Sequence, residues 1–234
     1  MSADALLEVF FPPACVACGE VLPAKGFFCE ACEALLDETP DVCCARCSEP
    51  GRFDGGLCPR CAARPPPFAK AFAPYEHDGA VARAIHRFKY EDQPELARPL
   101  AGLLAVKAGG FLERAGGAVC PIPLHAQRFR DRKYDQATLL AAELAKATGR
   151  PLRDGWLERV KATRRQVGLP EDVREANVRG AFAASAGAKG QAVVLIDDVY
   201  TTGATASEAT RALLAAGASE VYVLTLARAR RESL

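Results

Sequence analysis

The chain of 234 residues lacks several features that would assign it to a membrane, secreted or strongly charged class. It contains no run of about 20 apolar residues, so no segment is expected to span a bilayer. The first residues include Asp4 and Glu8 but no basic stretch, which is not typical of a secretory signal. We therefore expect a cytoplasmic protein without membrane insertion. Lys and Arg number 30 against 29 Asp and Glu, so the net charge is +1 and any site for a polyanion must be local.

Cysteine is scarce after residue 61 and dense before it. Nine of the ten cysteines precede residue 62, and eight of them form four CxxC pairs. The second quartet is the first displaced by 29 residues, which indicates an internal duplication. Two CxxC pairs supply the four thiolates of a closed, structural zinc site, so two Zn²⁺ ions are predicted. The expected ligands are Cys15, Cys18, Cys29 and Cys32 in the first repeat and Cys44, Cys47, Cys58 and Cys61 in the second.

Two alternatives accompany this metal prediction. The cysteines could form disulfides, although the absence of a secretory signal disfavours an oxidising compartment. Cys43 could replace its neighbour Cys44, although the 29-residue repeat favours Cys44. A proline-rich stretch at 64–68 then separates the duplicated segment from the rest of the chain. We expect a double zinc ribbon at residues 1–68 and a second domain at 74–234.

The second domain alternates helical and strand patterns. Helices are predicted at 78–90, 94–107, 136–148 and 204–216, and strands at 118–122, 156–160, 192–196 and 220–226. Residues 161–178 show no clear period and are expected to form a long loop with some helix. Strand, helix and strand at 192–226 form a βαβ unit, which predicts an α/β fold with a parallel sheet flanked by helices. Cys120 is expected to be a buried free thiol, and the arginines Arg228, Arg230 and Arg231 are expected to be solvated.

The strongest functional pattern is VVLIDDVYTTGAT at 193–205. Its apolar residues predict a buried strand, and Asp197 and Asp198 follow at the end where open α/β sheets bind ligands. The next residues lead into a helix whose N-terminal N–H groups can bind phosphate. Two carboxylates suit a vicinal diol or a metal ion, so the pattern predicts a site for a ribose 5-phosphate. The phosphate-binding residues would be Thr201, Thr202, Gly203, Ala204 and Thr205.

This stretch resembles the phosphoribosyl diphosphate signature of type I phosphoribosyltransferases, and the whole chain resembles the ComF (competence protein F) family. The other matching segments are IHRFKY at 85–90, PIPLH at 121–125, RDRKYDQATLLA at 130–141 and RRQVGLPEDVREANVRGAF at 164–182. The family usually has Arg-Gly-Phe-Asn-Gln where this chain has residues 132–136. Arg132 and Gln136 therefore match the family, whereas Lys133, Tyr134 and Asp135 depart from it.

The resemblance implies a type I phosphoribosyltransferase domain that binds phosphoribosyl diphosphate with Mg²⁺. It assigns catalytic roles to Asp197 and Asp198. It places a pyrophosphate loop at 123–136, where cationic side chains would stabilise the leaving group. A second loop at 163–177 would close over the substrate and exclude water. Beyond the turn at 201–205, the implied substrate-binding residues are His125, Arg128, Arg132, Lys133, Gln136, Arg165 and Gln166.

Three classes of function remain open. The chain could transfer the phosphoribosyl group to an acceptor, which the sequence does not identify because no residue stands out as its general base. It could instead be a competence factor that binds single-stranded DNA through its ribbons and acts with DNA-uptake proteins, since the resemblance implies a link to natural transformation. It could also bind phosphoribosyl diphosphate as a sensor, without turnover.

Overall fold

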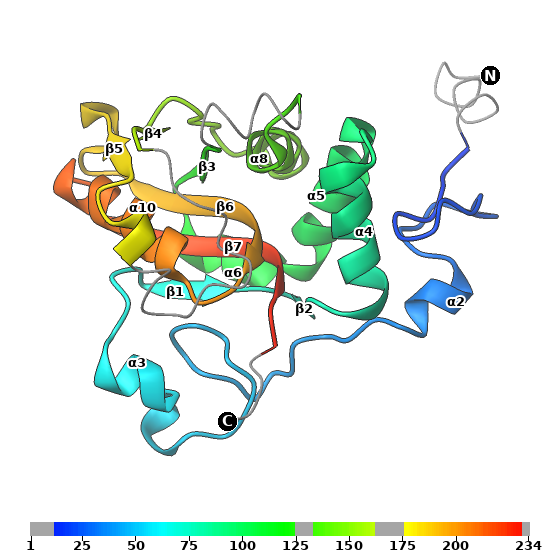
Figure 1. The fold of residues 1–234 in the computed structure, drawn as a ribbon, viewed down its shortest axis with the longest axis horizontal. Helices are drawn as coiled ribbons and strands as arrows, with labels where there is room; N and C mark the ends of the chain where they lie inside the picture. The colour runs from blue at the N-terminus through cyan, green and yellow to red at the C-terminus, as the bar shows by residue number, and fades with distance from the viewer. Residues whose placement is uncertain (1–11, 125–132, 162–175, 231–234) are drawn as a thin grey trace.

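The computed structural model describes residues 12–124, 133–161 and 176–230 (Figure 1). Its centre is a parallel sheet in the order β1-β7-β6-β3, and β2 also pairs with β7. Residue pairing keeps the long strands β6 and β7 together over their full length, from Ala192 opposite Glu220 to Tyr200 opposite Arg228. The strands are β1 (Lys70–Phe72), β2 (Tyr75–Glu76), β3 (Ala118–Pro121), β6 (Ala192–Tyr200) and β7 (Glu220–Arg228).

Helices cover both faces of this sheet, as the predicted α/β fold requires (Figure 1). On β6, Val194 and Ile196 join one core cluster, whereas the alternate residues Val193 and Leu195 join the other. This alternation explains why the strand is apolar throughout, since both of its faces are buried. Helices α4 (Gly79–Tyr90), α5 (Ala97–Lys107), α6 (Gly109–Ala115) and α8 (Gln136–Thr148) belong to the first cluster, and α10 (Ala204–Ala215) belongs to the second.

The predicted elements of the second domain are largely confirmed, with several differences. Helix α6 and the short strands β1 and β2 were not predicted. The segment predicted as one helix at 94–107 begins with a short 3₁₀ turn, η2 (Pro94–Leu96), before α5. The strand predicted to end at Ile196 continues to Tyr200, because β7 runs beside it and pairs with Val199 and Tyr200. β4 (Leu157–Arg159) pairs antiparallel with an unpredicted strand, β5 (Phe182–Ala184), in a separate two-stranded sheet. A further 3₁₀ turn, η3 (Ala186–Ala188), follows β5. Most of the loop predicted at 161–178 lies outside the described residues.

The two cysteine-rich repeats fold alike. Backbone bridges join Ala14 to Val21 and, 29 residues later, Cys43 to Pro50. Each repeat then forms a short helix, α2 (Glu30–Glu33) or α3 (Pro59–Ala63), and the second also contains the 3₁₀ turn η1 (Asp54–Gly56). Gly19 and Ser48 follow the first CxxC pair of each repeat and both have positive φ. The common geometry confirms that the repeat in the sequence is a repeat in the structure.

Each repeat packs against a different face of the sheet. Val16 and Leu22 of the first repeat belong to the core cluster that contains α4 and α5. The cysteines of the second repeat belong to the opposite cluster, which contains α10. The domain bounds 1–68 and 74–234 remain a prediction, and the repeats are in close contact with the segment that follows them.

The arginines at the end of the chain include one whose predicted environment was wrong. The side chain of Arg228 is 1% exposed and pairs with Glu49, while Arg230 pairs with Asp37 and Glu76. Because these partners lie 150 residues or more away in the chain, no local pattern indicates them. Cys120 is fully buried, as predicted. Within the described ranges, no helix combines the length and the hydropathy needed to span a bilayer.

Candidate functional site

The eight predicted zinc ligands form two compact tetrads. In each, the four Sγ atoms lie within 4.8 Å of one another. The Sγ atoms of Cys18 and Cys29 are 3.7 Å apart, as are those of Cys47 and Cys58. Thiolates at about 2.3 Å from a tetrahedral zinc ion lie about 3.8 Å from each other, so both tetrads fit Zn²⁺. The tetrads are compatible with two structural zinc ions.

Backbone N–H groups stabilise the thiolate of the first cysteine in each repeat. Burial raises the pKa of Cys15, but N–H groups of Cys29, Cys18 and Ala17 lower it to about 6 overall. Cys44 is affected in the same way, with a pKa of about 7. Its donors are Cys58, Cys47 and Arg46, each 29 residues after its counterpart in the first repeat. Lowered pKa values favour the deprotonated form that binds metal.

The structure distinguishes Cys43 from Cys44. The Sγ atom of Cys44 belongs to the second tetrad and accepts a hydrogen bond from the backbone of Cys58 at 3.3 Å. Cys43 is half-buried, and its Sγ atom is not part of the tetrad. Its backbone instead bridges to Pro50. This placement supports Cys44 as the ligand, in agreement with the repeat.

Asp197 and Asp198 lie near the carboxyl end of β6, with a lysine from another element beside them. The Nζ atom of Lys89, on α4, lies 2.8 Å from Oδ1 of Asp198, and both side chains are less than a fifth exposed. The backbone N–H of Asp198 donates to Oδ1 of Asp197 at 2.8 Å. Burial and the neighbouring Asp198 raise the pKa of Asp197 to about 7. The pair therefore has more negative charge than Lys89 alone neutralises.

A third carboxyl group, from Asp135, lies close enough to interact electrostatically with this pair. Asp135 is the N-cap of α8 and accepts hydrogen bonds from the backbone of Leu124 at 2.6 Å and Thr138 at 3.1 Å. Burial raises its pKa, although these N–H groups act in the opposite direction. Asp197 and Asp198 lie on β6, whereas Asp135 begins α8 and is bonded to Leu124, just beyond the end of β3, the strand that pairs with β6.

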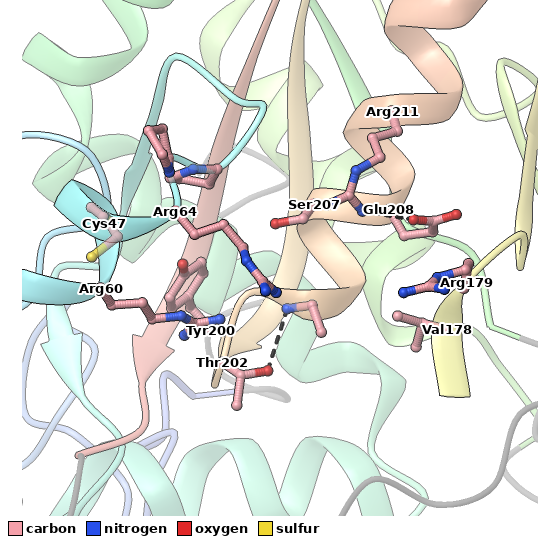
Figure 2. Close-up of a pocket in the computed structure, with 14 residues that line it drawn as sticks. Cys47, Arg60, Arg64, Val178, Arg179, Tyr200, Thr202, Ser207, Glu208 and Arg211 are labelled. Atoms are coloured by element: carbon pink, nitrogen blue, oxygen red, sulfur yellow. Dashed lines mark hydrogen bonds and ion pairs between the residues drawn. The ribbon is translucent and has the colours of Figure 1, made fainter. Parts of the chain in front are cut away.

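The turn after β6 has the backbone form that close approach to a ligand needs. Gly203 has φ 78°, a left-handed conformation that favours glycine. A Cβ atom there would lie 2.3 Å from the hydroxyl of Tyr200, so no larger residue fits without rearrangement. The next residue begins α10, and its N–H donates to Oγ1 of Thr202 at 3.3 Å (Figure 2). Thr201 and Thr205 are half-buried on either side of this helix start.

The implied pyrophosphate loop is described in part. Lys133 forms an ion pair with Asp92 and has φ 65°, at the position where the related family usually has glycine. The hydroxyl of Tyr134 donates to the carbonyl of Phe88 at 2.6 Å. Gln136 is buried at the start of α8. Their roles in binding substrate remain predictions. The other implied substrate-binding residues lie outside the described residues, namely His125, Arg128, Arg132, Arg165 and Gln166.

Lys89 is the residue of this site that the sequence pattern did not identify. It lies on a basic helix, 109 positions from its partner Asp198, and such helices are usually solvated. A possible signal was its place in the IHRFKY segment that resembles the family. The parallel sheet brings α4 to the end of β6, and only that arrangement makes Lys89 part of the site.

Comparison with known proteins agrees with these two structural parts. Residues 6–62 match the double zinc ribbon domain model, and residues 136–234 match the phosphoribosyl transferase domain model. The chain is thus a double zinc ribbon protein with a phosphoribosyltransferase fold. It is 31% identical over 228 residues to competence protein F of Haemophilus influenzae, covering 94% of this chain and 99% of that protein. The chain belongs to the competence protein F family.

Two other similar proteins were found. The DNA utilization protein YhgH of Salmonella typhimurium is 29% identical over 205 residues, which cover 86% of this chain and 89% of that protein. A solved structure, the allosteric regulatory enzyme of purine biosynthesis, is 25% identical. Its match covers 55% of this chain and 25% of the enzyme chain, with a TM-score of 0.37.

Proposed function

We propose that the chain binds phosphoribosyl diphosphate at the carboxyl end of β6 and transfers its phosphoribosyl group to an acceptor. The observation that carries this proposal is the juxtaposition of the Asp197–Asp198 pair with the turn at 201–205. The turn offers helix N–H groups to the 5-phosphate. The carboxylates of Asp197 and Asp198, a few residues before this turn, can accept hydrogen bonds from the ribose hydroxyls of the same ligand.

The carboxyl cluster also fits a magnesium ion. Its donors are hard oxygen atoms, which Mg²⁺ prefers. Burial and the neighbouring Asp198 raise the pKa of Asp197, and a bound cation would favour its ionised form. Asp197 and Asp198 would hold the ion together with the substrate, and the ion would supply charge neutralisation for the diphosphate. As the bond to the leaving group loosens, these carboxylates would also offset positive charge on the ribose.

Binding and turnover can be tested separately by calorimetry. Thr202→Val should weaken binding of ribose 5-phosphate and phosphoribosyl diphosphate alike, by roughly 1.5–3 kcal/mol, because both carry the 5-phosphate. Thr148→Val is the matched control, since Thr148 is the last residue of α8 and lies at the opposite end of that helix from Asp135. Asp197→Asn and Asp198→Asn should reduce turnover more than binding, because charge on the ribose develops in the transition state.

Release of pyrophosphate on addition of candidate acceptors separates an enzyme from a sensor that binds without turnover. Normal binding and normal turnover in all three site variants would contradict the proposal. The turn would then be an ordinary helix start.

A role in DNA uptake is the second candidate function, and the names of the relatives, a competence protein and a DNA utilization protein, favour it. Here the ribbons would contact single-stranded DNA or DNA-uptake proteins. Binding of single-stranded DNA that weakens steeply with salt would support direct contact. A cytoplasmic location is consistent with both candidates and belongs to the same proposal.

A further inference from the structure

A second pocket lies between the second cysteine repeat and α10. Its volume is about 510 Å³, within the range of sites for small ligands and cofactors. One wall is α3 and the prolines that follow it, and the other is formed by α10 and residues 178–179 (Figure 2). Thr202 and Ala204 lie at its edge, so the pocket adjoins the phosphate-binding turn without including Asp197 or Asp198.

The charge of this pocket is strongly unbalanced. Four arginines line it, Arg60 and Arg64 from the repeat and Arg179 and Arg211 from the opposite wall. Among the described lining residues one, Glu208, is acidic. Its carboxylate already accepts from the backbone of Gly180 at 2.6 Å and pairs with Arg211 at 2.7 Å. Among the described lining residues, arginines thus outnumber acidic residues by four to one.

Arg60 and Arg64 are held in place by the zinc-binding repeat. Arg60 lies on α3, and Arg64 is the residue that ends this helix. Cys58 is the N-cap of that helix and Cys61 lies within it, and both belong to the second tetrad. In Figure 2, Arg64 extends toward the turn that contains Thr202, and Arg60 lies beside Tyr200. The second repeat thus forms one wall of the pocket as well as a cysteine tetrad.

We infer that this pocket binds the terminal phosphate of a second, nucleotide-sized ligand. Guanidinium groups bind phosphate oxygens through paired hydrogen bonds, and Arg is favoured wherever that geometry matters. A phosphomonoester or diphosphate carries about two or more negative charges at one point, which suits a cluster of several guanidinium groups. A backbone diester offers one charge per nucleotide and would engage fewer of these arginines at once.

Calorimetry with thymidine 5′-monophosphate tests this inference. We expect the monophosphate to bind and thymidine, which lacks the phosphate, to bind much more weakly. Arg60→Gln combined with Arg64→Gln should weaken binding of the monophosphate by about tenfold or more, because each loses a charged hydrogen-bond donor. The matched control is Arg98→Gln combined with Arg114→Gln, which removes the same charge from exposed positions on α5 and α6.

A variant on the opposite wall guards against damage to the zinc site. Arg179→Gln should also weaken binding of the monophosphate by about tenfold, while the zinc content of the protein stays unchanged. Equal losses in the Arg98/Arg114 control would show a general charge effect and overturn the inference. Binding that is unaffected by all the pocket variants, or no binding by the wild type, would overturn it as well.

Oligonucleotides and ribose 5-phosphate answer two further questions. The first is whether the phosphate belongs to a DNA strand end or to a free nucleotide, and the second is whether this pocket is separate from the site at Asp197 and Asp198. If the pocket binds the ends of DNA strands, a thymidine oligonucleotide with a 5′-phosphate should compete with thymidine 5′-monophosphate for it. If the pocket binds free nucleotides, the oligonucleotide should not compete. The inference holds in both cases, because the ligand is a terminal phosphate in each. Equal, arginine-dependent binding of an unphosphorylated oligonucleotide would overturn it in favour of a backbone site. Ribose 5-phosphate should bind the pocket variants normally, and a matching loss would assign the arginines to the first site. If wild type binds the monophosphate but not ribose 5-phosphate, the proposed transferase function fails and the second pocket stands.

Discussion

At the scale of single residues, Asp197 is a buried carboxyl group with several charged neighbours. Its carboxyl group is next to Asp198, interacts with Asp135, and has Lys89 as the nearby cation. Burial and Asp198 raise its pKa to about 7, from the ordinary value near 4. A folded protein tolerates such a group at neutral pH at some cost in stability, which is typical of sites that bind charged ligands.

The pH dependence of stability follows from this pKa. Between about pH 4 and pH 7, the folded state keeps a proton on Asp197 that the unfolded state has released, so this group makes the protein less stable as pH rises. Asp197→Asn cannot ionise. We expect its stability relative to wild type to increase by on the order of 3 kcal/mol between pH 4.5 and pH 7.5. Urea unfolding at both pH values measures the difference.

The control for this comparison is Asp41→Asn, which removes an equal charge from an exposed position. It should change stability little at either pH. Zinc binding also depends on pH, but it affects wild type and both variants alike and cancels in the comparison. An advantage of Asp197→Asn that is the same at pH 4.5 and pH 7.5 would contradict the raised pKa.

At the scale of elements, each cysteine repeat has backbone hydrogen bonds that shape the loop around its first CxxC pair. Gly19 and Ser48 adopt positive φ directly after the first CxxC pair. This lets Gly19 donate back to the carbonyl of Cys15, and Ser48 to that of Cys44, at 2.8 and 3.0 Å. These backbone bonds close the knuckle, and metal binding would add its free energy to the same local fold. Ser48 also donates from its hydroxyl to the carbonyl of Ala71, which ties the second knuckle to β1.

Substitution of the adjacent cysteines tests the ligand assignment. Cys44→Ser should reduce bound zinc from about two ions per chain to about one, because it removes one of four thiolates from a closed site. Cys43→Ser should retain both ions and serves as the matched control. Metal analysis of protein purified under reducing conditions measures this. Loss of zinc in Cys43→Ser with retention in Cys44→Ser would reverse the assignment.

Periodic and repeated patterns predicted the elements well. The helix at 136–148 has the predicted bounds, because Asp135 caps its start and Gly149 ends it in a left-handed conformation. The two tetrads followed from spacing alone. The strand end at Tyr200 was missed because pairing with β7, rather than hydropathy, decides where β6 ends.

Contacts between distant segments could not be predicted from local patterns. Lys89 reaches Asp198 across 109 positions, and the arginine pocket brings together α3, α10 and residues 178–179. A basic residue on an isolated helix or at a chain end is usually solvated, so the pattern favoured that interpretation for Arg228. The fold reverses it by placing the end of β7 against the second repeat.

At the scale of the whole molecule, the two cysteine repeats pack against opposite faces of one sheet. Arg87, on α4, donates to the carbonyls of Cys15 and Val16 in the first repeat, both at 3.1 Å. Arg46, in the second repeat, donates to the carbonyls of Phe68 and Ala69 at 3.0 and 2.8 Å. These bonds, with the shared core clusters, make the repeats part of the sheet's covering. The second repeat therefore forms part of the wall of the second pocket.

The buried arginine of β7 should be the strongest single link between the sheet and the second repeat. Arg228 donates to the carbonyl of Cys47 at 3.2 Å and pairs with Glu49, and its side chain is almost wholly buried. Arg228→Met keeps most of the volume but leaves Glu49 without this cation. We expect a loss of about 3–5 kcal/mol in the free energy of unfolding, as for other broken buried pairs.

Lys107→Met is the contrasting control, because Lys107 pairs with Glu38 at an exposed position that also joins the N-terminal segment to the second domain. Such surface pairs contribute about 1 kcal/mol or less, so this variant should be close to wild type. Hydrogen exchange adds a local measure: amides of residues 44–51 should exchange faster in Arg228→Met than in Lys107→Met. Equal stability losses and equal exchange in the two variants would show that burial of Arg228 adds nothing, and that the second repeat is held to the sheet by its apolar contacts alone.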